Sequence, residues 1–283
     1  MNSLKMYCLS LNPKHLEIIK KLDYIPVGLG EETFSEDWLS DRTKNNISLK
    51  NKFYGEYTFH YWIWKNYLDQ LGNEWIGFCQ YRKFWSVDKS GIQNVNFRLF
   101  NNFILKEIPK EYLNYDSILG EPLYINQFRL SKFLKNNIKT MAKNPSLFFN
   151  KNKRKIKFHF DMMHGSNNLD KAIELLDIKE KNDFKNFINN NVSFNPQNML
   201  ICKSKEILVS YYESIFPWLQ RCESVFGFDD LKGYGLQRIY AFLAERYMSY
   251  WFQKYTKYKI MPIFFKDLTD YLEHEQNINE NNE

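Results

Sequence analysis

Residues 45–84 constrain the fold of this 283-residue chain more than any other stretch. A polar turn over residues 45–51 leads into a segment whose aromatic and aliphatic side chains recur every three or four residues: Phe53, Tyr57, Tyr61, Trp64 and Leu68. That spacing predicts a helix from about residue 53 to residue 68. An apolar run over residues 75–79 follows a short break and predicts a buried strand. The stretch is therefore expected to form a turn, a helix and a strand in direct succession.

The predicted strand ends in four polar or cationic residues, Gln80, Tyr81, Arg82 and Lys83. In open α/β sheets, ligands bind in the crevice outside the carboxyl ends of the strands. An arginine there can hold diphosphate oxygens through two parallel hydrogen bonds. The pattern thus predicts an anion site at this strand end, and the alternative is that Arg82 forms an ion pair that closes the core.

Two polar residues, Glu56 and His60, lie one turn apart on the otherwise apolar helix. A buried pair of this kind must be hydrogen-bonded. We expect a structural Glu56–His60 pair, with a catalytic pair as the alternative.

The rest of the chain alternates between strand and helix patterns. Residues 5–11 and 24–28 predict strands around a helix at 15–22, which is typical of a βαβ unit and a parallel sheet. Further strands are predicted at 115–119 and near 200–202, and further helices at 169–178, 181–190, 207–225 and 237–246. Pro217 is expected to kink or divide the helix over residues 207–225.

Three motifs in one order carry a family resemblance. They are the Asn46-Ile47-Ser48-x-Lys50-Asn51 turn, the Tyr61-Trp62-Ile63-Trp64-Lys65-Asn66 helix and the Gly77-x-x-x-Tyr81-Arg82-Lys83-Phe84 strand end. The chain resembles a bacterial family of capsule and O-antigen gene clusters, long catalogued as a domain of unknown function. Its members are regarded as GT-A type glycosyltransferases, and some are galactofuranosyltransferases. The sequence departs from that pattern at Gln80, Lys83 and Gly55, where the family usually has histidine, arginine and cysteine.

The resemblance implies an α/β fold of the GT-A, Rossmann-like type, with a mostly parallel central sheet flanked by helices and a helical C-terminal part. It implies one domain over residues 1–272, with a nucleotide-binding part to about residue 125 and an acceptor part beyond it. The Asn- and Glu-rich tail over residues 273–283 is expected to be disordered. The expected activity is hexosyl transfer from a nucleotide sugar, UDP-linked and with UDP-galactofuranose as one candidate, to a surface polysaccharide or lipid-linked glycan.

Resemblance and residue type together suggest three groups of site residues. The donor-binding group is Asp41, Asn46, Ser48, Lys50, Asn51, Tyr81, Arg82 and Lys83. The acceptor-binding group is His159, His164 and Asn198. For the base, the candidates are Asp229 and Asp230 in a loop before a helix, with Asp161 as the alternative, because a carboxylate near the acceptor hydroxyl would suffice.

The strand end also bears on metal use. Most GT-A enzymes hold a divalent metal with an Asp-x-Asp motif there, whereas this chain has Gln80-Tyr81-Arg82-Lys83. We therefore expect a metal-independent reaction without a cofactor, in which cations replace the metal. The alternative is a divalent metal held by the His159-x-Asp161-x-x-His164 arrangement. A Glu245-Arg246 pair in the last helix is expected to be a buried ion pair.

Composition limits the remaining classes. The aromatic content of 18% suits a cleft for sugars, and a non-catalytic carbohydrate-binding protein is the alternative to an enzyme. The net charge of +6 gathers in a basic run at Lys151, Lys153, Arg154, Lys155 and Lys157. We expect a solvated loop there, with attraction to an anionic membrane surface as the second reading and nucleic-acid binding as the weakest.

The four cysteines, Cys8, Cys79, Cys202 and Cys222, show no C-x-x-C spacing, which favours reduced thiols in a cytoplasmic protein. No signal peptide and no apolar run of spanning length is recognised. The expected location is the cytoplasm, with peripheral contact at the inner face of the membrane as an addition.

Overall fold

The computed structural model describes residues 2–87, 95–128 and 150–272. The strands in those residues are β1 Leu4–Ser10, β2 Ile25–Gly28, β3 Leu39–Ser40, β4 Trp75–Gln80, β5 Lys83–Trp85, β6 Ser117–Gly120, β7 Leu123–Tyr124, β8 Ser193–Phe194, β9 Leu200–Cys202, β10 Tyr258–Met261 and β11 Ile263–Phe265. The α-helices are α1 Leu16–Lys21, α2 Asn51–Tyr54, α3 Tyr57–Asn66, α4 Phe97–Phe103, α8 Ile156–His164, α9 Asn168–Glu174, α10 Ile178–Asn190, α11 Lys205–Phe226, α12 Tyr234–Gln237 and α13 Ile239–Tyr255. Short 3-10 turns occur at Pro13–His15, Ser48–Lys50, Leu68–Gln70, Lys110–Tyr112, Ile125–Gln127 and Lys151–Lys153.

Within the described residues, one central sheet has the order β10-β6-β9-β4-β1-β2-β3, and β5 and β11 extend it from β4. Neighbours along this order are parallel except at β9, which runs antiparallel to both β4 and β6. The parallel β1–β2 pair confirms the predicted βαβ start. Strands β9 and β10, from the expected acceptor part, lie in the same sheet as β1 from the expected nucleotide-binding part.

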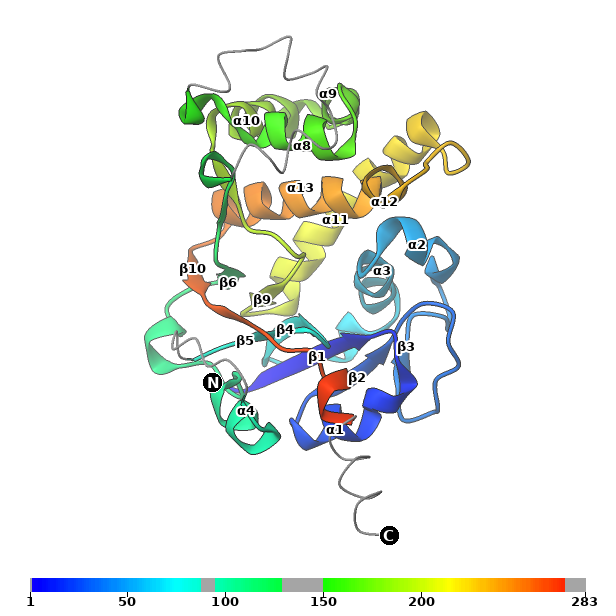
Figure 1. Cartoon of the computed structure of the whole chain (residues 1–283), viewed down its shortest axis with the longest axis vertical. Coiled ribbons are helices and arrows are strands. Elements are labelled where there is room, and N and C mark those ends of the chain that lie inside the picture. Colours follow the sequence, from blue (N-terminus) through cyan, green and yellow to red (C-terminus); the bar gives the residue numbers. More distant parts are fainter. Residues whose placement is uncertain (1, 88–94, 129–149, 273–283) are drawn as a thin grey trace.

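Helices cover both faces of the sheet because side chains alternate along the buried strands. On β1, Tyr7 and Leu9 join the core with α3, α11 and α13, whereas Met6 and Cys8 join a second core with α1 and α4. Figure 1 shows α1 and α4 below the sheet and α3 and α11 above it. The fold is therefore a mostly parallel sheet between helical layers, as expected.

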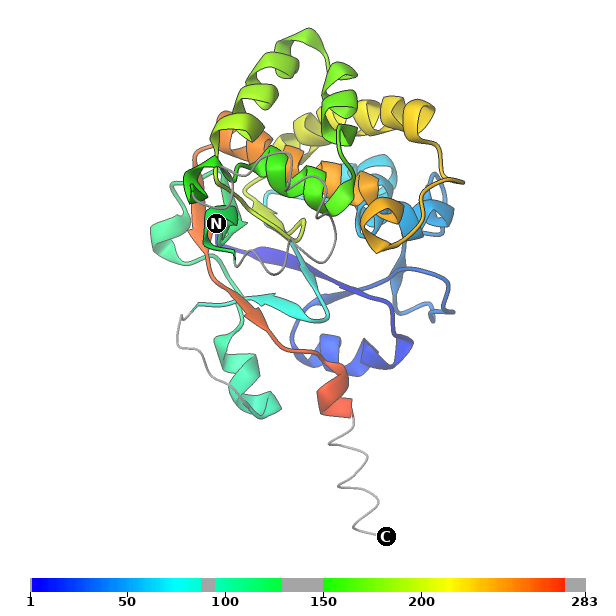
Figure 2. The ribbon, with the colours of Figure 1, turned by 45° about the horizontal axis from the view of Figure 1, so that its top comes forward.

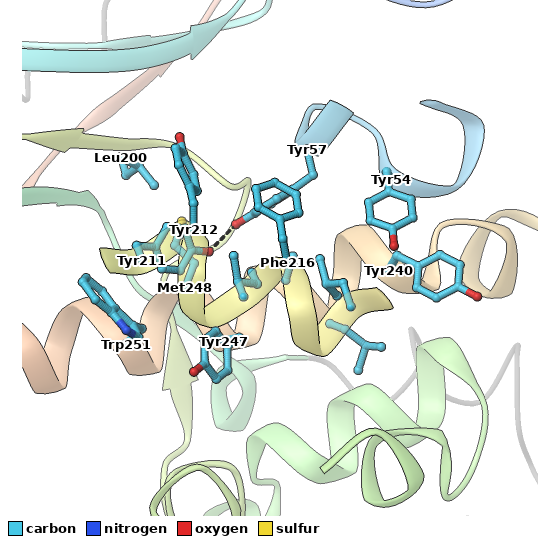
Figure 3. Packing of buried hydrophobic residues seen from close by; sticks show 14 of the residues in the cluster. Tyr54, Tyr57, Leu200, Tyr211, Tyr212, Phe216, Tyr240, Tyr247, Met248 and Trp251 are labelled. Atoms are coloured by element: carbon cyan, nitrogen blue, oxygen red, sulfur yellow. Dashed lines mark hydrogen bonds between the residues drawn. The ribbon is translucent and has the colours of Figure 1, made fainter. Parts of the chain in front are cut away.

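A helical layer from the C-terminal part caps this arrangement. Helices α8, α9 and α10 lie over α11 and α13, as Figure 1 and the turned view in Figure 2 both show. Tyr57 on α3 reaches Tyr211 on α11, and their hydroxyl oxygens are 2.5 Å apart in the buried core (Figure 3). Tyr54 stacks on Tyr240 with ring centroids 4.9 Å apart. Such rings supply large apolar area while their hydroxyls still find partners.

Several predicted helices differ in their bounds, since α9 ends at Glu174 and α13 continues to Tyr255, and two differ in how they are divided. The helix expected over residues 53–68 is divided into α2 and α3, because Gly55 has a φ of 55°, which ends α2. The division expected at Pro217 is wrong, since α11 continues through it. Pro217 is exposed between the buried Phe216 and Trp218, and the packing of these neighbours holds the helix together despite the missing hydrogen bond.

The four cysteines are buried and free, as expected for reduced thiols. The predicted disorder of residues 273–283 lies outside the described residues. None of the helices that the structure describes is both long and apolar enough to cross a membrane.

Candidate functional site

A cleft opens at the carboxyl ends of β1 and β4. Its walls are completed by the segments before β9, around α2 and along the start of α13. The lining residues are Leu9, Ser10, Leu11, Leu29, Asn51, Gly55, Glu56, Gln80, Tyr81, Arg82, Lys83, Gln197, Asn198, Tyr234, Arg238, Ala241, Phe242 and Glu245. The cleft therefore lies at the sheet edge where the sequence placed the site.

The cationic strand end lines this cleft because β4 turns back immediately into β5. Gln80 pairs with Lys83 across the antiparallel β4–β5 step, which leaves Tyr81 and Arg82 in the connecting turn. The Arg82 carbonyl accepts a hydrogen bond from the backbone N–H of Lys266, which fixes the turn. Tyr81, Arg82 and Lys83 are thus brought together at the cleft, as the predicted anion site requires.

Among the described residues, the cations that line the cleft are Arg82, Lys83 and Arg238. Arg82 is exposed, and its guanidinium lies 4.9 Å from the centre of the Tyr81 ring. No ion pair of Arg82 is found within the part of the chain that the structure describes, so the alternative of a core-closing pair has no support there. Lys83 is half-buried, and burial lowers the pKa of its ammonium group while Glu56 and Glu245 oppose that shift. Arg238 is the third, and sequence reasoning did not select it.

Glu56 points to the cleft and does not pair with His60. Its Oε1 accepts hydrogen bonds from Asn198 Nδ2 at 3.0 Å and from Gln80 Nε2 at 3.3 Å, and its Oε2 lies 4.0 Å from Arg238 Nη2. His60 instead meets the Tyr212 hydroxyl through Nδ1 at 2.7 Å. Burial lowers the pKa of His60 to about 3. The expected Glu56–His60 pair is wrong because Gly55 and Glu56 precede α3 and lie at its cleft end.

Glu245 is the second carboxylate of the cleft, and a buried network holds it from behind. Its Oε1 accepts the Gln197 backbone N–H and its Oε2 accepts Arg246 Nη1, both at 2.5 Å. Burial raises the pKa of Glu245, and Arg246 acts in the opposite direction. The ion pair expected from the sequence is confirmed, although one of its members also lines the cleft.

His159 and His164 lie beneath this pair and are not among the cleft-lining residues. Arg246 Nη2 is 3.0 Å from His159 Nδ1 and 3.4 Å from His164 Nε2. Burial, with a smaller contribution from Arg246, lowers the pKa values to about 3 for His159 and about 2 for His164. Since His164 Nδ1 faces the Gly235 carbonyl at 3.0 Å, the neutral ring donates there and accepts from Arg246. Both histidines thus contact Arg246 in the interior, and neither lines the cleft.

The turn before β9 forms part of the cleft wall in a strained conformation. Gln197 and Asn198 have φ values of 80° and 53°, which non-glycine residues seldom adopt. Asn198, predicted to bind the acceptor, lines the cleft and donates to Glu56 and to the Ala241 carbonyl. The side-chain oxygens of Gln197 and Asn198 are buried without a hydrogen-bond partner in the described structure. Strain and unmet polar atoms of this kind gather at functional sites.

The remaining predicted donor residues divide into two sets. Asn51 lines the cleft, and its Nδ2 donates to the Gly55 carbonyl at 3.0 Å. Asn46 and Ser48 hydrogen-bond within their own turn, and Lys50 pairs with Glu223 at 2.7 Å, so these three lie apart from the cleft. Asp41 follows β3, is fully buried and is not in the cleft lining. Burial raises the pKa of its carboxyl group to about 6, with Thr58 and Arg42 acting in the opposite direction.

The aspartates predicted as bases do not reach the cleft. Asp229 and Asp230 are exposed in a turn after α11. Asp161 pairs with Lys157 at 2.9 Å and accepts the Asn167 backbone N–H at 3.2 Å, which anchors the end of α8. The carboxylates that do line the cleft are Glu56 and Glu245. The sequence signal for Glu56 is a charged residue on an otherwise apolar helix, and this signal also fits the structural role expected above.

The His159-x-Asp161-x-x-His164 arrangement does not gather in space. Both histidines face the Arg246 guanidinium, whereas Asp161 faces Lys157. Among residues 2–87, 95–128 and 150–272, no three His, Cys, Asp or Glu side chains come together as a metal-binding group.

Part of the basic run is engaged internally. Arg154 is buried and donates to the Phe128 carbonyl, Lys155 donates to the Asn190 carbonyl, and Lys157 pairs with Asp161 and Asp170. The expected solvated loop is therefore wrong for Arg154 and Lys157, because both side chains form hydrogen bonds or ion pairs with other segments of the protein. Lys151 and Lys153 are exposed, as expected for a solvated segment.

Comparison with known proteins gives two matches. Residues 7–257 match the model of a family described as a domain of unknown function, DUF4422. The apo structure of the WbbM bifunctional glycosyltransferase is similar with a TM-score of 0.64 at 19% sequence identity. The likeness covers 93% of this chain and 45% of the WbbM chain, so this chain spans less than half of that protein. No curated protein matches the sequence.

Proposed function

This chain belongs to the family described as a domain of unknown function (DUF4422). We propose that it is a glycosyltransferase using a nucleotide-sugar donor. The fold shared with the WbbM bifunctional glycosyltransferase supports the proposal at the level of reaction class. The observation that carries it is the convergence of Arg82, Lys83 and Arg238 in a cleft at the carboxyl ends of the central strands.

A nucleoside diphosphate is the leaving group of such a transfer, and its negative charge grows as the bond to the sugar breaks. Preorganised cations in a partly water-excluded cleft stabilise that charge in the transition state. Arg82 and Arg238 present guanidinium groups suited to diphosphate oxygens, and Lys83 adds a point charge. Because burial already lowers the pKa of Lys83, a bound diphosphate would favour the ammonium form. These three residues are the proposed diphosphate clamp, and the reaction is proposed to be metal-independent.

The finer assignments follow the same reasoning. We expect a UDP-linked donor, with UDP-galactofuranose among the candidates, and an acceptor on a surface polysaccharide or lipid-linked glycan. Aromatic residues Tyr81, Tyr234 and Phe242 in the cleft lining offer flat apolar faces to sugar rings. Cytoplasmic location and peripheral membrane contact remain part of the proposal. We propose no nucleic-acid partner, since Arg154 and Lys157 of the basic run are engaged internally.

A thermal-shift panel tests the proposal directly. UDP, UDP-glucose, UDP-galactose and UDP-galactofuranose would each be added with and without EDTA, and the melting temperature recorded. A ligand that binds the folded state raises the apparent stability as its concentration exceeds the dissociation constant. We expect UDP and at least one UDP-sugar to raise Tm equally in both conditions.

The clamp is tested with Arg82→Ala and Lys83→Gln. Each should weaken UDP binding by about 10-fold or more, since hydrogen bonds to charged groups contribute roughly 1.5–3 kcal/mol. Lys65→Gln is the control, because Lys65 lies over the Trp64 ring outside the cleft. Absence of binding by every nucleotide in the wild type would refute the proposed function, and an EDTA-sensitive shift would refute metal independence.

A further inference from the structure

Glu56 has the contacts of an acceptor-activating group. Given the proposed glycosyl transfer, on which this step depends, we infer that the Glu56 carboxylate is the general base that takes the proton from the acceptor hydroxyl. Its side chain is 17% exposed and lines the cleft with the three cations. A general base must come within hydrogen-bond reach of the proton that it removes, which requires an oxygen that the protein leaves available.

The two oxygens of Glu56 have different environments. Oε1 accepts Asn198 Nδ2 at 3.0 Å and Gln80 Nε2 at 3.3 Å. Both amide groups are fixed in this orientation, since Asn198 Nδ2 also meets the Ala241 carbonyl and Gln80 Nε2 the Gln197 carbonyl. Oε2 has no hydrogen bond within the described residues, and Arg238 Nη2 lies 4.0 Å away. The carboxylate is therefore anchored by one oxygen and offers the other to the cleft.

Glu245 does not meet the same requirement. Its Oε1 is occupied by the Gln197 backbone N–H and its Oε2 by Arg246. It also forms a buried ion pair with the guanidinium of Arg246. Glu245 therefore acts as a positioning residue that holds the Gln197–Asn198 turn, and through Asn198 it orients Glu56.

The remaining carboxylates near this end of the molecule are excluded by placement. Asp229 and Asp230 are exposed in a turn and do not line the cleft. Asp41 is fully buried and is likewise not part of the lining. Within the described residues, Glu56 is thus the cleft carboxylate with an available oxygen.

The chemical step is a single displacement. The acceptor oxygen forms a bond to the anomeric carbon of the donor while its proton passes to Glu56 Oε2. The bond from that carbon to the diphosphate oxygen breaks, and its electron pair leaves with the diphosphate, which the cations stabilise. Glu56 later releases the proton to solvent. Attack from the face opposite the diphosphate inverts the anomeric configuration.

Glu56→Gln tests the inference because the amide keeps the shape and cannot accept the proton. UDP release from the UDP-sugars above would be followed with octyl galactoside and octyl N-acetylglucosaminide as acceptor probes, and UDP affinity would be measured by calorimetry. We expect kcat to fall by about 100-fold or more while UDP affinity is retained. NMR of the wild-type product should show an inverted anomeric centre.

Glu223→Gln is a matched control. The Glu223 side chain is 18% exposed, close to the 17% of Glu56, and it pairs with Lys50 outside the cleft. Its activity should stay at the wild-type level. Wild-type turnover in Glu56→Gln, loss of UDP binding together with turnover, or a retained anomeric configuration would each overturn the inference. A wild type that neither binds UDP nor releases it from any donor would instead refute the proposed function.

Discussion

Glu56 and Asn198 are 142 positions apart in the chain and meet in a 3.0 Å hydrogen bond from Asn198 Nδ2 to Glu56 Oε1. The bond joins the start of α3 to the turn before β9, two segments that are distant in sequence and both line the cleft. The same turn carries two consecutive residues with positive φ. The contact therefore links the orientation of a cleft carboxylate to a strained piece of backbone.

This link predicts unequal effects of two substitutions at residue 198. Asn198→Ala removes the hydrogen bonds and keeps a side chain at a φ of 53°, whereas Asn198→Gly removes the same bonds and relieves the strain. We expect Asn198→Ala to lose about 2–4 kcal/mol of unfolding free energy and Asn198→Gly about 1 kcal/mol less. Urea denaturation would measure both. Equal losses would show that the positive φ stores no appreciable strain.

Gly55 allows Arg238 to reach the cleft. A Cβ at residue 55 would lie 2.6 Å from Arg238 Nη2, and the φ of 55° disfavours any side chain. Gly227 has nearly the same φ of 57°, and a Cβ there would meet nothing within 4 Å. We expect Gly55→Ala and Gly227→Ala to lose similar stability, about 1–3 kcal/mol.

Only Gly55→Ala should also weaken UDP binding, because only that change displaces a guanidinium of the proposed clamp. Calorimetry with UDP on both variants would separate strain from displacement. An undiminished UDP affinity in Gly55→Ala would remove Arg238 from the clamp.

Asp41 predicts a pH-dependent contribution to stability. Burial raises the pKa of its carboxyl group in the folded state from 3.8 to about 6, so the folded state favours the protonated form. The contribution is fully present below the unfolded pKa and is lost as the pH rises through about 6. The shift corresponds to about 3 kcal/mol at most.

Asp41→Asn removes this titration. The difference in unfolding free energy between Asp41→Asn and wild type should therefore move in favour of the variant by about 2–3 kcal/mol between pH 4 and pH 7. Urea unfolding at a series of pH values would measure it. Parallel stability curves for the two proteins would mean that Asp41 has an ordinary pKa.

The features predicted correctly from the sequence are those with a local signal. The apolar run over residues 75–79 predicted the strand, and the three-to-four-residue spacing before it predicted the helix. The polar residues after residue 79 placed the cationic end at the sheet edge. Arg82 and Lys83 could be selected because a strand fixes where its next residues lie. The division at Gly55 was missed because an isolated glycine in an aromatic run gives no sign of its φ.

The carboxylates could not be selected in this way. Glu56 and Glu245 are distant in sequence, and only tertiary packing shows which of them keeps an available oxygen. Asp161 and His164 looked suitable from residue type alone. In the structure Asp161 pairs with Lys157 and His164 contacts Arg246, and no local sequence pattern predicts these partners.

Because Glu245 and Arg246 form a buried ion pair, we expect the losses of unfolding free energy from substituting each of them to be strongly non-additive. Arg246→Met would leave the Glu245 carboxylate buried without its cation, because the Nη1 contact at 2.5 Å is its charged partner. Breaking a buried pair from one side costs about 3–5 kcal/mol, whereas replacing both partners costs much less. We expect Arg246→Met to lose that much unfolding free energy and the double variant Glu245→Gln/Arg246→Met to regain about 1–3 kcal/mol of it. Chemical denaturation of the two single variants and the double variant completes the cycle. Strictly additive losses of unfolding free energy would show that the Glu245 and Arg246 side chains do not depend on each other. The buried ion pair would then not be what stabilises Glu245 against the Gln197–Asn198 turn.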